Sequence, residues 1–418
     1  MPTDIDLKNE PPLVDAFQSP DRLLMGAGPS RVHEDVLKAM SQTTIGHLDP
    51  AMVAMMDELK DMLRYVFQTK NAMTFPVSGP GSLGMEACVN NVVERGDKVI
   101  VAINGVFGTR MAEVTRRAGA EVIVTEDEWG TAVDPDKVEA ALKENPGVKA
   151  VGFVHAETST GALSDAATIC HLAKDHDAMS IVDTVTSLGG VPVNIDVWGA
   201  DAVYSGTQKC LSCAPGISPV TFSSRATDVI QARKTPVQSW FLDLSLVMNY
   251  WTDGAGAPRS YHHTAPVNAL YGLHESLLMI REEGIENSWT RHRRNSDALR
   301  AGFRAMGLDP LVSEDIHLPQ LTTLKVPEGV DKPKSRKILL DNYDLEVGGG
   351  LGGLAGKVWR IGLMGQSSTP AHVILCLSAM EGTLKEMGID IVEGAAVPAA
   401  QAILFGGDGS GGSSQKAA

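Results

Sequence analysis

Short apolar runs alternate with segments of helical spacing along the chain from about Ala72 onward. This alternation is typical of an α/β fold in which helices cover both faces of a mostly parallel sheet. The runs predict seven strands, at 72–77, 98–102, 121–125, 149–154, 179–183, 201–205 and 219–222. Before them, methionine and leucine side chains recur at helical spacing from Met52 to Phe67, and this stripe predicts a helix that faces the core.

The pattern changes in the second half of the chain. It is irregular between about 224 and 264, and long helices are then expected from Pro266 to Glu283 and from Ser288 to Met306. Strands near 321–326 and 358–363, with helices near 334–342 and 370–387, predict a smaller C-terminal α+β domain. We therefore expect four parts: an N-terminal arm (1–24), a large domain (25–283), a small domain (284–395) and a flexible tail rich in Ala, Gly and Ser (396–418).

Composition narrows the class of protein. The 418 residues carry a formal net charge of -15, which argues against a nucleic acid or an anionic membrane surface as partner. Apolar runs stay well below the ~20 residues of a membrane span. Five scattered cysteines and an N-terminus without signal-peptide character favour a cytoplasmic protein with reduced thiols.

Two strands end in residues that can carry chemistry. Lys209 follows the strand at 201–205, and Asp183 ends the strand at 179–183. A buried lysine can form a Schiff base with a carbonyl, although most lysines after a strand point into water. An aspartate after a strand more often caps a helix. Together the two residues fit pyridoxal phosphate, which needs an amine for its aldehyde and an anion for its pyridine nitrogen.

Residues 79–84 match the pattern G-x-G-x-x-G between a strand and a helix, which raises the alternative of an NAD-dependent dehydrogenase. The acid that a dinucleotide site needs about 20 residues later, at the end of the next strand, is missing. Free amides at a helix N-terminus, with the hydroxyl of Ser82, suit a single phosphate group. A turn whose glycines allow close packing explains the pattern equally well.

Phe107 and Arg360 are weaker candidates. Phe107 follows a strand end, where its ring could stack on a ligand or pack in the core. Arg360 lies in an apolar strand, where it could bind a substrate carboxylate or form a buried ion pair. We predict no metal site, because Cys210 and Cys213 form a single CxxC and because His262 and His263, adjacent on an extended segment, should point opposite ways.

Seven motifs, occurring in order over roughly residues 22 to 390, resemble those of class V aminotransferases of fold type I, among them the alanine-glyoxylate aminotransferases. They are Gly26–Ser30, Tyr65–Lys70, His155–Gly161, Val182–Gly190, Tyr204–Lys209, Tyr261–Thr264 and Val358–Gly362. The resemblance implies pyridoxal 5'-phosphate as cofactor and a homodimer with active sites shared across the interface.

The resemblance also implies a role for each matching residue. Lys209 would form the Schiff base and move the Cα proton, Asp183 would pair with the pyridine nitrogen, and Arg360 would bind the substrate carboxylate. The remaining site residues would be Gly28 and Thr158 beside the substrate, Phe107 and Thr158 at the ring, Gly81, Ser82 and Gln208 at the phosphate, and Tyr261 and Thr264 from the second subunit. Phe107, Ser82 and Thr158 stand where the animal enzymes have tryptophan, histidine and serine.

The implied reaction moves an amino group from a small L-amino acid, alanine first, to glyoxylate by a ping-pong route. The loop 46–50 differs from the animal enzymes and resembles bacterial relatives with other donors, so serine and ureidoglycine are alternatives. A cysteine desulfurase is disfavoured, because Gln208 precedes the lysine where those enzymes have histidine and the loop 344–357 contains no cysteine. A catalytically silent binding protein is disfavoured by the joint presence of Lys209, Asp183 and Arg360.

Overall fold

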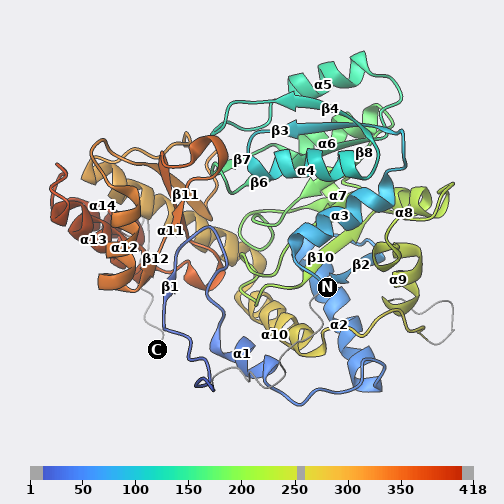
Figure 1. Cartoon of the computed structure of the whole chain (residues 1–418), viewed down its shortest axis with the longest axis horizontal. Helices are drawn as coiled ribbons and strands as arrows, with labels where there is room; N and C mark the ends of the chain where they lie inside the picture. Colours follow the sequence, from blue (N-terminus) through green and yellow to red (C-terminus); the bar gives the residue numbers. More distant parts are fainter. Residues whose placement is uncertain (1–12, 252–258, 407–418) are drawn as a thin grey trace, which may run out of the picture.

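The computed structural model describes residues 13–251 and 259–406. Its larger part is built on a seven-stranded sheet in the order β2-β10-β9-β8-β5-β3-β4 (Figure 1). Within it β10 runs antiparallel to both neighbours, and the other strands are parallel to one another. All seven predicted strands are confirmed to within one residue at each end: β2 (Met73–Val77), β3 (Lys98–Ile103), β4 (Glu121–Glu126), β5 (Ala150–Val154), β8 (Met179–Asp183), β9 (Ala202–Tyr204) and β10 (Ser218–Phe222).

Helices pack around this sheet and bury its faces. They are α1 (Glu34–Met40), α2 (Pro50–Phe67), α3 (Gly81–Val92), α4 (Val106–Arg117), α5 (Pro135–Glu144), α6 (Ala166–Asp175), α7 (Ile195–Trp198) and α10 (Val267–Glu283). Helix α2 begins where the Asp49 side chain accepts a hydrogen bond from the Ala51 amide, with proline at the first position.

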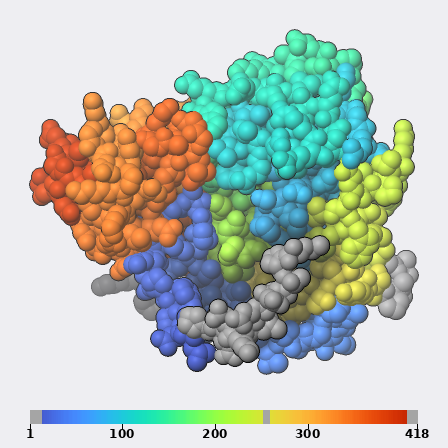
Figure 2. Space-filling model, in the orientation of Figure 1, coloured from blue at the N-terminus to red at the C-terminus, as the bar shows by residue number. Residues whose placement is uncertain are grey.

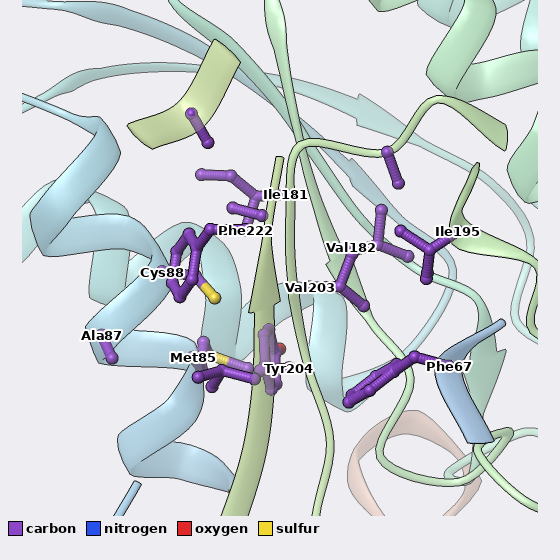
Figure 3. Close-up of a cluster of buried hydrophobic side chains, with 14 of the residues drawn as sticks. Phe67, Met85, Ala87, Cys88, Ile181, Val182, Ile195, Val203, Tyr204 and Phe222 are labelled. Atoms are coloured by element: carbon purple, nitrogen blue, oxygen red, sulfur yellow. The ribbon is translucent and has the colours of Figure 1, made fainter. Parts of the chain in front are cut away.

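The methionine stripe of α2 lies in the core, as predicted, with Met52 and Met56 fully buried. Figure 3 shows how strand β9 divides this core: Tyr204 faces Met85 of α3, whereas Val203 faces the side that holds Phe67. Alternation of side chains along a strand places successive residues on opposite faces of the sheet. The short apolar strand therefore packs against helices on both sides.

The C-terminal part forms a lobe (Figure 2, orange to red) and has a separate hydrophobic core. Its sheet contains β11 (Leu321–Lys325), β13 (Gly348–Gly349) and β14 (Val358–Gly362), and its predicted helices are present as α11 (Ile285–Met306), α12 (Lys332–Tyr343) and α13 (Pro370–Glu386). In addition, β1 (Leu23–Leu24) pairs in parallel with β12 (Leu345–Glu346). The predicted boundary at 24/25 is wrong here, because β1 and the buried Met25 belong to the C-terminal core.

Two further expectations are corrected. The predicted flexible tail contains helix α14 (Ala396–Phe405), which buries Ala396, Ala400 and Leu404 in the C-terminal core. The alanine-rich composition of this segment does not reveal that one face of the helix is apolar. Residues 1–12 of the arm and 407–418 of the tail lie outside the described residues. The irregular stretch holds α8 (Ser224–Gln231), a 3-10 turn at Trp240–Leu242, and α9 (Leu244–Trp251), elements too short to show a clear period.

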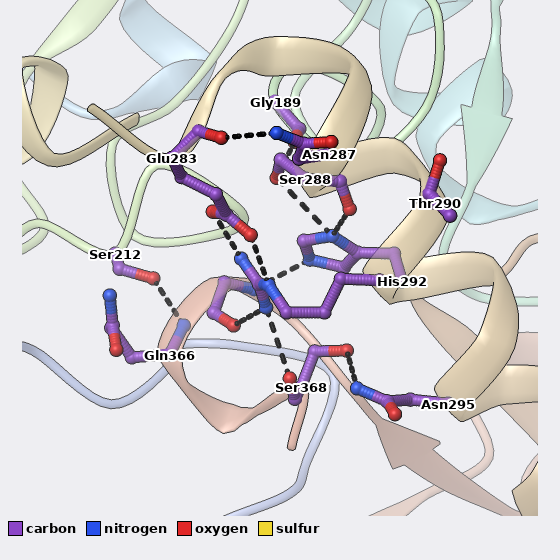
Figure 4. A network of polar contacts seen from close by, with 12 residues as sticks. Gly189, Ser212, Glu283, Asn287, Ser288, Thr290, His292, Asn295, Gln366 and Ser368 are labelled. Atoms are coloured by element: carbon purple, nitrogen blue, oxygen red, sulfur yellow. Dashed lines mark hydrogen bonds and ion pairs between the residues drawn. The ribbon is translucent and has the colours of Figure 1, made fainter. Parts of the chain in front are cut away.

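A polar network joins the start of α11 to the loop that follows Lys209 (Figure 4). The buried His292 donates through Nδ1 to the Ser288 carbonyl (2.7 Å) and accepts through Nε2 from the Gly365 amide (2.9 Å). Burial lowers the pKa of His292 to about 3, so the ring is neutral and can play both parts. The next amide, Gln366 N, donates to the Ser212 hydroxyl (2.8 Å), so the network supports the segment after Lys209.

Among the described helices, none combines the length and apolarity needed to cross a membrane.

Candidate active site

A cavity of about 140 Å³ lies at the carboxyl ends of strands β5 and β8 and in front of helices α3 and α4. Ligands of open α/β sheets bind at this edge. Seven of the residues singled out in the sequence line this one cavity: Gly81, Ser82, Phe107, Thr158, Asp183, Gln208 and Lys209. Residues that are more than 120 positions apart in the chain are thus brought together by the parallel strands.

Lys209 lies in the loop between β9 and β10 and is only 8% exposed. Its Nζ donates to the Ala27 carbonyl, and its own carbonyl accepts from the Ser30 hydroxyl (2.6 Å). Burial lowers the pKa of Lys209 from 10.5 to about 8, and the nearby Arg360 guanidinium acts in the same direction. A lysine in this setting can exchange protons near neutral pH.

Gly28 lies directly against the amino group of Lys209. Its φ of +101° is one that residues with a side chain rarely adopt, and a β-carbon at this position would collide with Nζ of Lys209. The glycine therefore keeps free the space around the lysine amine.

Asp183 is held by donors on both of its oxygens. Tyr204 donates its hydroxyl to Oδ2 (2.7 Å), and the Val185 amide donates to Oδ1 (2.8 Å). Burial raises the pKa of Asp183 from 3.8 to about 6, although both hydrogen bonds favour the charged form. Sequence reasoning placed Tyr204 in a motif without giving it this role; its position opposite Asp183 in the register of β8 and β9 is the signal that could have found it.

The first turn of α3 offers free donors to the cavity. The helix has no side-chain cap at Pro80, and the amides of Gly81 and Ser82 have no acceptor among the described residues. The Gln208 side chain also lines the cavity, and its Oε1 is buried without a partner in the described chain. Helix N-terminal amides and the NH₂ group of a carboxamide can donate to an anion.

Phe107 sits in the first turn of α4, with the guanidinium of Arg110 4.9 Å from the centre of its ring. Arg110 also donates to the Ser82 hydroxyl (3.3 Å) and lines the cavity, so it links the first turns of α3 and α4. Sequence reasoning missed Arg110, although its spacing of three from Phe107 places the two side chains on one face of a helix.

Arg360, on β14, lies beside the cavity and comes from the C-terminal part of the molecule. Its Nε donates to the Gly349 carbonyl (2.7 Å) and its Nη1 to the Thr158 carbonyl (3.1 Å). Its Nη2 has no acceptor among the described residues, which leaves a donor for a ligand. Burial lowers the pKa of Arg360, an effect that the nearby Glu157 opposes.

The structure does not bring Tyr261 or Thr264 to this cavity. Tyr261 is 60% exposed and packs against the ring of His47 (5.1 Å between centroids). The expectation that His262 and His263 point apart is wrong, because their Nδ1 atoms are 2.8 Å from each other and Trp240 stacks on His262. The loop bends here, so strand-like alternation does not apply.

The described residues contain no group of three or more side chains suited to a metal ion. Cys210 and Cys213 are free and buried, and burial raises the pKa of each thiol to about 12.

Residues 22–355 match the family model for class V aminotransferases. The chain belongs to this family. Its relatives include the (S)-ureidoglycine–glyoxylate transaminase of Bacillus subtilis (strain 168), 38% identical over 401 residues that cover 91% of this chain and 95% of the relative. The alanine–glyoxylate aminotransferase of Rattus norvegicus is 39% identical, with 88% of each chain covered.

A solved structure, that of an alanine–glyoxylate aminotransferase from Nostoc sp., matches this aminotransferase with a TM-score of 0.86 and 44% identity over 89% of this chain and 97% of the other. Family membership decides against the dehydrogenase and the silent binding protein. The enzyme is a pyridoxal-phosphate-dependent transaminase of fold type I, with relatives that act on glyoxylate.

The cavity fits the cofactor on which the family depends. The amides of Gly81 and Ser82 have no acceptor among the described residues and can donate to a phosphate, and the carboxamide of Gln208, which lines the same cavity, can turn its NH₂ group toward it. Asp183 offers a buried carboxylate of raised pKa that a protonated ring nitrogen would neutralise. These three features correspond to the phosphate and ring nitrogen of pyridoxal phosphate.

Proposed function

We propose that this aminotransferase moves the amino group of a small L-amino acid, alanine first, to glyoxylate in two half-reactions, with pyridoxal phosphate bound in the cavity described above. When bound, the cofactor supplies an aldehyde that takes up the amino group and a protonated ring that draws electrons from Cα. The observation that carries the proposal is the joint lining of one cavity by Lys209, Asp183 and the first turn of α3.

Each of the site residues has a role in this proposal. Asp183 pairs with the ring nitrogen, Phe107 and Thr158 contact the ring, and Gly81, Ser82 and Gln208 hold the phosphate. With its pKa near 8, Nζ of Lys209 would take the proton from Cα of the amino acid and deliver it to the carbon that carried the cofactor aldehyde, and in the second half-reaction it would move a proton the opposite way.

The substrate carboxylate binds Arg360. Its guanidinium is already fixed by the Gly349 and Thr158 carbonyls and has a free donor. The side chain therefore loses little conformational entropy when the carboxylate binds. Gly28 leaves room for the amino acid beside Lys209, and Thr158 borders the same space.

A homodimer completes the site in this proposal. Tyr261 and Thr264 are exposed and lie outside the cavity of their own chain, which fits a role at the phosphate of a second subunit. Free, buried cysteines support a reducing compartment, and we propose the cytoplasm.

The donor depends on the loop 46–50. His47 of this loop contacts Tyr261, and its carbonyl accepts from the Tyr250 hydroxyl (2.9 Å). The loop that differs from the animal enzymes therefore touches a residue proposed to reach the second active site. Since the Bacillus subtilis relative acts on ureidoglycine, that donor and serine remain the alternatives to alanine.

Absorption spectroscopy tests the proposal. Purified enzyme should show the visible band of the bound cofactor, and L-alanine should change it. Lys209→Ala should abolish this response and slow turnover of alanine with glyoxylate by roughly 10³-fold, the scale of a lost acid–base group. Lys143→Ala, on the exposed side of α5, is the control. Parent enzyme without a visible band would refute the proposal, and rates with alanine, serine and ureidoglycine decide the donor.

A further inference from the structure

A second buried carboxylate lies close to the site and has no part in the proposed chemistry. Glu157 precedes Thr158 and is fully buried. The Arg360 guanidinium is close enough for its pKa to be raised by this carboxylate. A carboxylate is seldom buried unless its oxygens are satisfied, so its partners identify its role.

Both oxygens of Glu157 are occupied by donors of the protein. Oε2 accepts from the amides of Phe107 (3.0 Å) and Gly108 (3.3 Å). Oε1 accepts from the amide (2.9 Å) and the hydroxyl (2.6 Å) of Ser159. These four bonds use up the acceptor capacity of the carboxylate, so Glu157 is not free to bind a ligand.

The same bonds cap helix α4 from a distant part of the chain. The N-cap position of α4 is Gly105, which has no side chain, and a β-carbon there would collide with Glu157 and Ser159. The Ser159 hydroxyl accepts from the remaining first-turn amide, that of Val106 (2.9 Å). Glu157 and Ser159 thus replace the missing cap and fix the turn that carries Phe107.

The loop that carries Glu157 also holds Arg360. The carbonyl that accepts from Nη1 of Arg360 belongs to Thr158, and this peptide lies between the two residues that cap α4. Displacing Glu157 would therefore move the aromatic ring, the Thr158 side chain and the anchor of the guanidinium together.

We propose that Glu157 is a positioning residue of the transamination site, whose carboxylate joins the first turn of α4 and the 157–159 loop so that Phe107, Thr158 and Arg360 keep one fixed arrangement. This inference rests on the proposed function, which assigns Phe107 to the cofactor ring and Arg360 to the substrate carboxylate. Glu157 itself contacts neither the cofactor nor the substrate in this proposal.

The test is Glu157→Gln, which keeps the shape of the side chain but lets it accept at one end only. Either the two amides of α4 or the amide and hydroxyl of Ser159 then face an NH₂ group. We expect KM for both the amino acid and glyoxylate to rise roughly 10-fold, with a smaller change in kcat, because loss of hydrogen bonds to a buried charge is costly. The circular dichroism of the bound cofactor should weaken as the ring of Phe107 loses its fixed position.

Asp165→Asn is the matched control. Asp165 caps helix α6 through the Thr168 amide (3.1 Å) and lies outside the cavity, so its variant makes the same carboxylate-to-carboxamide change at a helix cap away from the site. It should leave KM and the cofactor spectrum unchanged, and the melting temperature should change little because asparagine also caps helices. A Glu157→Gln enzyme that behaves like Asp165→Asn would overturn the positioning role.

Ser159→Ala keeps the inference testable if Glu157→Gln does not fold. This variant retains the carboxylate and removes one hydroxyl, which bonds to both Glu157 and the Val106 amide. KM should rise a few-fold in the same direction, and unchanged KM and spectrum would overturn the inference. Failure of the proposed function is distinguishable, since the parent enzyme itself would then lack the visible band and turnover.

Discussion

The last residue of strand β8, Asp183, and the segment after strand β5, with Glu157, each place a carboxylate in the interior at the same edge of the sheet. The two strands are neighbours, with Val154 paired to Asp183, and Glu157 follows three residues later. Asp183 faces the cavity, whereas the oxygens of Glu157 are all taken by amides and a hydroxyl of the protein. The two acids lie in nearly equivalent positions but have different roles. The number of protein donors around each carboxylate decides which one can bind a ligand.

The largest effect should come from Asp183→Asn. The amide keeps the shape and can accept from Tyr204, but it cannot neutralise a protonated ring nitrogen. Since breaking a buried ion pair costs about 3–5 kcal/mol, we expect kcat/KM to fall roughly 10²- to 10⁴-fold. Steady-state kinetics with saturating cofactor measure this. A loss below tenfold would show that Asp183 is a structural acid like Glu157 and would contradict the different roles given to the two carboxylates.

Tyr204→Phe should have an intermediate effect. It removes the donor to Oδ2 of Asp183, a bond that favours the charged carboxylate. A hydrogen bond to a charged group contributes about 1.5–3 kcal/mol, so the pKa of Asp183 should rise by roughly one or more. The acidic limb of the kcat/KM profile should move to higher pH by that amount.

Tyr65→Phe is the control for that shift, because the Tyr65 hydroxyl accepts from the Ile285 amide and does not line the cavity. Identical acidic limbs in the parent and Tyr204→Phe enzymes would contradict the role of Tyr204.

The smallest effect concerns the stability of the cofactor-free protein. The folded chain binds a proton at Asp183 with a pKa of about 6, against 3.8 in the unfolded chain. Between these values the folded state holds more protons, so the contribution of Asp183 to the free energy of unfolding falls as pH rises from about 4 through 6. Burial also raises the pKa of Glu157, which acts in the same direction.

Calorimetry of the cofactor-free protein between pH 4 and 7 measures this dependence. In Asp183→Asn the decline should be shallower than in the parent, and Glu157→Gln should flatten it too. Parallel curves for all three proteins would show that neither carboxyl has the raised pKa that burial implies.

The central part of the site was predictable from sequence. The carboxyl ends of parallel strands lie at one edge of a sheet, so residues there converge, and this rule predicts that Lys209 and Asp183 lie near the turn at Gly81 and Ser82, as the lining of the cavity confirms. Arg360 was a candidate by its setting in an apolar strand. Its anchoring to Thr158 was not predictable, because the two residues are 202 positions apart.

The apolar period along the chain predicted the strands of the large sheet, because burial imposes spacing on a sequence, and the identity of Lys209 and Asp183 at strand ends indicated the chemistry. Only the tertiary structure decided which carboxylate stays available, since that depends on donors such as Tyr204 and the Phe107 amide that arrive from other segments. It also decided that 396–405 is a helix, because a short alanine-rich stretch is ordered only by the surface it packs against. Local spacing is encoded in sequence, whereas side-chain partners are set by packing.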